Sequence, residues 1–161
     1  LLPVYGLSLS LAPETAAKLV GTFILGGVIF QLPIGFIADK IDRYNLMYGS
    51  ALFSALALLL IIELWHVPVA LFVLLFISGG LIGSFWTIPL MLFGDMFEGS
   101  DLASVNSISA ILYGLGSTIG PSIVGVCMLW SPHGLMGAMA LPTITLAGAS
   151  LIYRFLCRQR S

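Results

Sequence analysis

Five long apolar segments, separated by short polar or charged stretches, constrain this chain more than any other feature. A helix that crosses a bilayer needs about 20 apolar residues, and each segment approaches or exceeds that length. In lipid the backbone must satisfy its own hydrogen bonds, which leaves helices and closed barrels as spanning structures. The segments lack the alternating pattern of barrel strands. The sequence therefore predicts an all-α integral membrane protein.

The boundaries of these segments define the predicted spans. A shorter apolar stretch, residues 1–11, is expected to be part of a further helix that begins upstream. The whole chain, 1–161, is expected to form a single transmembrane domain that ends in a tail at 154–161. The five full spans are predicted at residues 16–38, 46–64, 69–93, 104–129 and 135–153.

Composition agrees with a membrane location. The chain is 59% hydrophobic and 8% charged, with a mean hydropathy of +1.10, whereas soluble domains carry about 25% charged residues. The sequence contains no motif of a hydrolase, metalloprotease, phosphate loop or nucleic-acid-binding module. Cys127 and Cys157 are predicted on opposite membrane faces, too far apart for a disulfide. We expect no enzyme activity, no cofactor, no metal site and no nucleic-acid partner.

The basic residues indicate the orientation. Because cytoplasmic loops of membrane proteins are enriched in Lys and Arg, the loop at 39–45 and the C-terminal tail are predicted to face the cytoplasm. We expect a multi-pass protein of the bacterial inner membrane. Lys18 is then the one basic residue near the outer face, and the other five are cytoplasmic: Lys40, Arg43, Arg154, Arg158 and Arg160.

This orientation also places three other titratable residues. His66 and His133 fall in outer turns, where we expect them to be solvated. Glu63 is the only carboxylate within a predicted span, and an intramembrane carboxylate is a candidate functional group. It lies two residues before Trp65, however, and Trp is enriched at membrane interfaces. We therefore expect Glu63 to be interfacial.

The loop after the first full span concentrates charge, with Asp39, Lys40, Asp42 and Arg43 in five positions. One interpretation is that these residues only anchor the loop in the cytoplasm. Together with Gly35, however, they resemble the loop signature G-x-L-A-D-R-x-G-R-K of the major facilitator superfamily. Two positions depart from it, because aspartate occupies position 42 in place of the usual glycine and tyrosine position 44 in place of a basic residue.

The resemblance implies that Gly35, Asp39, Lys40 and Arg43 form a gate loop between two conformations. Gly35 permits close helix approach, and the planar guanidinium of Arg43 can bind a carboxylate with two hydrogen bonds. In the family the aspartate faces a helix of the opposite six-helix half, where a helix N-terminus attracts a carboxylate. The partner of Asp39 is therefore expected outside this chain.

Small residues recur in two other spans. Gly116 and Gly120 lie one helical turn apart, a spacing that favours close helix packing. Pro121 removes a backbone donor and is expected to bend the helix. With Gly125 they resemble the G-x-x-x-G-P helix of the same family, which implies a hinge; packing alone is the alternative. In the third span another set is expected to serve packing: Gly79, Gly80 and Gly83.

The resemblance implies a twelve-helix transporter of two halves, with a substrate cavity near the midplane between them. The third span lacks the arginine that is usual in the N-terminal half, and the chain ends in a polar stretch. Both features favour the C-terminal half, from part of helix 7 to helix 12. Candidate cavity residues, any of which could instead lie in a helix interface, are Tyr5, Gln31, Trp86, Tyr113 and Ser117.

The sequence thus predicts secondary active transport of a small molecule by alternating access. The expected partners are the substrate, membrane lipid and the missing N-terminal six-helix half. The aromatic, weakly polar cavity residues favour a neutral or amphipathic substrate. Two alternatives remain open: a transport-inactive membrane sensor, and a scaffold that homodimerises through its glycine-rich helices.

Overall fold

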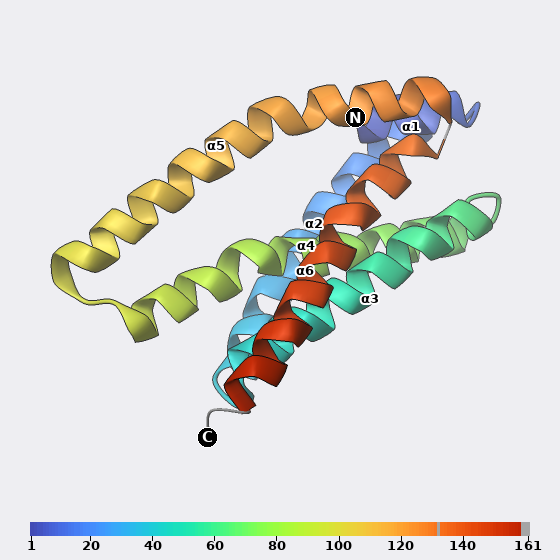
Figure 1. The fold of residues 1–161 in the computed structure, drawn as a ribbon. Coiled ribbons are helices and arrows are strands. Elements are labelled where there is room, and N and C mark those ends of the chain that lie inside the picture. The colour runs from blue at the N-terminus through green and yellow to red at the C-terminus, as the bar shows by residue number, and fades with distance from the viewer. Residues whose placement is uncertain (132, 159–161) are drawn as a thin grey trace.

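The computed structural model describes residues 1–131 and 133–158, with side chains up to residue 152 (Figure 1). Five of the helices in these ranges are long and apolar enough to cross a membrane. This confirms the predicted all-α fold with five full helices and one shorter one. In chain order the helices are α1 (Leu2–Ser8), α2 (Pro13–Ala38), α3 (Arg43–Leu64), α4 (Pro68–Met96), α5 (Gly99–Trp130) and α6 (Gly134–Arg158).

The long helices extend beyond the predicted spans because helix geometry does not end where the lipid ends. Helix α3 begins at Arg43 since the side chain of Asp42 accepts a hydrogen bond from the backbone N–H of Asn45, at 3.0 Å. Such a cap satisfies a donor that the helix start leaves free. Helix α6 continues to Arg158, so the first part of the predicted tail is helical. Residues 159–161 lie outside the described part of the chain.

Helix pairs that are distant in sequence make most of the packing. Helix α2 packs on α4, and α3 packs on both α4 and α6, whereas the neighbours α2 and α3 barely touch. Helix α1 lies on α2. One hydrophobic cluster joins α1, α2, α3, α4 and α6, and its most buried members include Tyr5, Leu19, Leu58, Leu75 and Met136.

Glycines set the closeness of the α2–α4 crossing. A Cβ atom on Gly26 would overlap the carbonyl oxygen of Phe76, and a Cβ on Gly79 would overlap the carbonyl oxygen of Phe23. Because the backbones of Phe76 and Phe23 cannot move away without separating the helices, positions 26 and 79 require glycine. This confirms the packing interpretation of the third-span glycines. We call this surface the glycine seam; it comprises Gly26 and Gly27 of α2 with Gly79, Gly80 and Gly83 of α4.

Helix α5 is packed differently from the other long helices. None of its residues is buried, and it approaches α6 mainly toward its own C-terminal end (Figure 1). A Cβ atom added at any of its helical glycines after Tyr113 would meet no neighbouring atom within 4 Å. Gly116 is exposed and Gly120, one helical turn further on, is half-buried. We call these two residues the glycine face of α5; Gly125 lies on the opposite side of the helix.

The curvature of α5, visible in Figure 1, has a local explanation. Pro121 lies inside the helix and lacks the N–H that would bond to the carbonyl of Ser117. The hydroxyls of Ser117 and Thr118 both donate to the carbonyl oxygen of Gly114, at 2.9 Å each. Such hydroxyl bonds to the preceding turn tend to bend helices. Pro121 is thus accommodated without breaking α5.

Candidate functional site

The predicted gate loop holds one ion pair to α4. The guanidinium of Arg43, at the first position of α3, pairs with the carboxylate of Asp95 near the end of α4. The same nitrogen donates to the carbonyl oxygen of Met91, at 2.6 Å. The Asp95 side chain is 56% exposed, so the pair contributes on the order of 0.2–1 kcal/mol. Arg43 thereby ties the start of α3 to the end of α4.

Sequence reasoning noted that Arg43 can bind a carboxylate but did not identify Asp95 as its partner. The two residues lie 52 positions apart, and no local pattern connects them. The alternation of spans did place both on the same membrane side. That signal would have reduced the choice to the acidic residues of the 94–103 stretch.

The other gate residues have different surroundings. Asp39 follows the last residue of α2 and is exposed, and no side-chain hydrogen bond or ion pair of Asp39 occurs within the described part of the chain. Lys40 is exposed as well. A Cβ on Gly35 would lie 3.8 Å from the terminal methyl carbon of Met91, an ordinary contact. Within this chain, close packing therefore does not require glycine at position 35.

A pocket of about 390 Å³ lies where α2, α4 and α5 meet. The rings of Trp86 on α4 and Tyr113 on α5 line it together, with centroids 4.9 Å apart and planes inclined by 56°. We call it the aromatic pocket. Its lining consists of Phe23, Ile24 and Gly27 from α2, of Gly79, Ile82, Gly83, Phe85 and Trp86 from α4, and of Tyr113 from α5.

The candidate cavity residues divide into three groups. Trp86 and Tyr113 line the aromatic pocket. Gln31 and Ser117 are exposed but do not line it, and the Ser117 hydroxyl is bonded to its own helix. Tyr5 is fully buried in the hydrophobic cluster. Tyr5 therefore does not line the aromatic pocket, because its ring packs in the hydrophobic cluster beside His133.

The environment of His133 differs from the predicted one. The hydroxyl of Tyr5 lies 3.1 Å from Nδ1 of His133, and the His133 ring also packs against Trp65 at a centroid distance of 6.2 Å. His133 is half-buried in its turn and thus less exposed than expected, since it links α1 with the two turns at this end of the bundle. His66 is exposed, as predicted.

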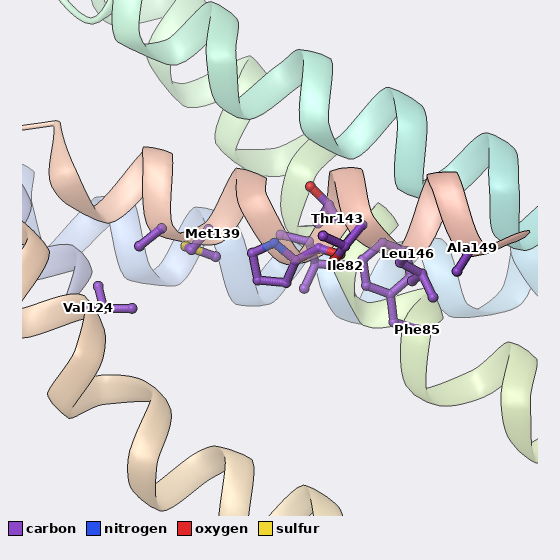
Figure 2. A pocket seen from close by; sticks show the side chains of 10 residues that line it. Ile82, Phe85, Val124, Met139, Thr143, Leu146 and Ala149 are labelled. Atoms are coloured by element: carbon purple, nitrogen blue, oxygen red, sulfur yellow. The ribbon is translucent and has the colours of Figure 1, made fainter.

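A second pocket, of about 660 Å³, lies between α4, α5 and α6 (Figure 2). It shares Ile82 and Phe85 with the aromatic pocket. We call it the apolar pocket, because every side chain that lines it is hydrophobic except for two threonines. Its lining consists of Ile82, Phe85, Val124, Ala138, Met139, Pro142, Thr143, Thr145, Leu146 and Ala149.

Neither pocket offers an evident metal site. Among the described residues, no group of three or more His, Cys, Asp or Glu side chains is placed to hold a metal ion. Cys127 is a free thiol, whereas the side chain of Cys157 lies outside the described part. Both pockets therefore present aromatic, aliphatic and hydroxyl groups.

Comparison with known proteins adds independent findings. The family model described as Major Facilitator Superfamily matches residues 1–159. The chain is 31% identical over 119 residues to the uncharacterized MFS-type transporter YfkF of Bacillus subtilis (strain 168). That match covers 74% of this chain but only 30% of the length of the relative. No solved structure shows significant similarity to the chain.

Proposed function

The chain belongs to the major facilitator superfamily, and from this premise we propose that it is the C-terminal half of a secondary active transporter. In this proposal α1 is part of helix 7, and α2 to α6 are helices 8 to 12. The missing N-terminal six-helix half completes the cavity. The transporter moves a neutral or amphipathic small molecule by alternating access.

The observation that carries this proposal is the exposed surface of α5. A membrane helix that faced only lipid would expose a uniformly apolar surface, yet α5 exposes Asn106, Ser107, Tyr113 and Ser117 as well as its glycine face. Polar and small residues in membrane helices favour contact with other helices or with a water-filled cavity. A second half that packs along α5 would supply both the helix contacts and the water-filled cavity.

The gate loop supports the same proposal. Arg43 has its partner within the chain, and Asp39, at the same membrane side, remains available for the opposite half. A carboxylate that faces a helix N-terminus gains about 0.3–1 kcal/mol when exposed and up to about 2 kcal/mol when partly buried. Contacts of this size bias a two-state equilibrium without locking it. We place this loop and the C-terminal tail in the cytoplasm of a bacterium.

Two-sided access to the aromatic pocket is the test. In the full-length protein with its native cysteines replaced, an Ile24→Cys variant places a thiol on the pocket wall. A membrane-impermeant maleimide should label it from either side of the membrane, because alternating access opens one cavity to each side in turn. Ile144→Cys, on an exposed face of α6 away from both pockets, is the control and should resist labelling.

The contrary result is labelling of Ile24→Cys from one side only. It would refute alternating access and favour the transport-inactive sensor. Orientation is tested separately with Lys40→Cys, which lies in the gate loop. This thiol should react only with reagent added to the cytoplasmic side.

A further inference from the structure

We propose that the apolar pocket is a second binding compartment, which takes the hydrocarbon part of a neutral amphipathic substrate. The polar end of the same molecule occupies the adjoining aromatic pocket. This inference rests on the proposed transport function and specifies its substrate class. Three features of the two pockets support it: the chemistry of the walls, their shared residues and their volumes.

The walls of the apolar pocket offer no charge and no free side-chain donor to a ligand. None of its lining residues is ionisable. Its two hydroxyls are already used within α6, since Thr143 donates to the carbonyl oxygen of Ala140 at 2.7 Å and Thr145 to that of Pro142 at 2.8 Å. A ligand carbonyl, carboxylate or phosphate placed there would lose its water without gaining a side-chain donor, which is costly. Hydrocarbon carries no such cost.

The two pockets meet at one turn of α4. Ile82 and Phe85, three residues apart and thus on one helix face, line both of them. Figure 2 shows these side chains beside Thr143 and Leu146 of α6. Beyond them, the indole N–H of Trp86 and the hydroxyl of Tyr113 are the side-chain donors among the residues that line the aromatic pocket. A single ligand can therefore place its apolar part on one side of Phe85 and its polar part on the other.

The volumes agree with this division. The apolar pocket measures about 660 Å³ and the aromatic pocket about 390 Å³, and sites for small ligands measure roughly 300–1,000 Å³. The competing occupant of the apolar pocket is an acyl chain of a bilayer lipid. The position of the apolar pocket beside the aromatic pocket, with Ile82 and Phe85 in both linings, favours the substrate, since a resident lipid gains nothing from a neighbouring pocket that offers donors.

Photolabelling tests the proposal on the full-length protein in lipid nanodiscs. The probe is 3-azioctanol, a small neutral alcohol that labels its binding site on irradiation. We expect saturable labelling of the α4 and α6 residues that line the apolar pocket, with competition by unlabelled octanol. Ala149→Phe, which fills the pocket, should reduce the labelling about tenfold. Ile144→Phe, which adds bulk outside the pocket on the same helix, should leave labelling unchanged.

Further variants keep the test independent of folding. Ala138→Phe fills the pocket from another position on α6 and should act as Ala149→Phe does, with the thermal unfolding midpoint of each variant as the folding control. Thr143→Val and Thr145→Val should label like the parent, because their hydroxyls already bond to α6. A loss of saturable labelling in the valine variants would show polar recognition and overturn the proposed substrate class.

A second readout links the two pockets. Octanol should slow maleimide labelling of Ile24→Cys in the parent protein but not when Ala149→Phe is also present. Saturable pocket labelling without this protection would assign the pocket to a bilayer lipid and overturn the proposal. Two-sided labelling of Ile24→Cys with no saturable photolabelling would overturn it too, yet leave the transport function standing. One-sided labelling of Ile24→Cys would refute the transport function itself.

Discussion

The glycine seam between α2 and α4 and the glycine face of α5 have similar sequences and opposite surroundings. In the seam, added Cβ atoms on Gly26 and Gly79 would overlap backbone carbonyl oxygens. On α5, added Cβ atoms on Gly116 and Gly120 would meet no atom within 4 Å. Glycine spacing therefore marks a surface suited to close helix packing. It does not reveal whether the partner helix lies in the same chain.

The largest expected effect belongs to the seam. Gly79→Leu should reduce the free energy of unfolding by about 3 kcal/mol, because the side chain meets the backbone of Phe23 and the two helices must separate. Thermal unfolding of the purified full-length protein measures this. Gly148→Leu is the matched control, because Gly148 is exposed on α6 and an added Cβ there would meet no atom within 4 Å. An equal loss of stability in that variant would show that the cost does not come from the α2–α4 contact.

The glycine face of α5 should respond in function. Gly116→Leu and Gly120→Leu add bulk to a surface that we expect to pack on the N-terminal half. Transport or inter-half cross-linking in the full-length protein should fall about tenfold, equivalent to about 1.4 kcal/mol, while membrane insertion persists. If both variants match the parent in these assays, the face is lipid-exposed and has no protein partner.

A smaller effect should distinguish Arg43, whose partner Asp95 lies on α4 of the same chain, from Asp39, whose partner is expected in the other half. Asp95→Asn removes a partner that lies within the chain, so it should destabilise this half by about 0.5 kcal/mol. Asp39→Asn should leave stability unchanged but shift the balance between inward-open and outward-open states, since its partner is expected in the other half. Unfolding curves and inter-half cross-linking, measured for both variants, should give opposite patterns.

The smallest expected effect is a gain. Gly116→Ala should raise the free energy of unfolding by about 0.5 kcal/mol, because alanine restricts the unfolded chain. The added methyl group would meet no atom of this chain within 4 Å. Gly26→Ala should destabilise the protein instead, since even a methyl group overlaps Phe76. Unfolding midpoints of this alanine pair test the comparison with the least chemical change.

The properties that sequence reasoning predicted well depend on local features. The all-α class and the five long helices follow from apolar length, and the packing role of Gly79 follows from the spacing of small residues. What sequence reasoning did not foresee depends on contacts between distant positions. Tyr5 lies in the hydrophobic cluster and His133 is half-buried, and the two residues contact each other across 128 positions. Asp95 and Arg43 likewise pair across 52 positions.

The near absence of contact between α2 and α3 also has a consequence for synthesis. The ribosome delivers helices to the membrane in chain order, yet α2 packs mainly on α4, and α3 completes its packing only with α6. Once the ribosome has delivered α3 to the membrane, the nascent chain therefore contains α2 and α3, which hardly stabilise each other. The α2–α4 pair can form completely only after α4 has been synthesised as far as Met96. The face of α3 that packs on α6 remains uncovered until α6 has entered the bilayer.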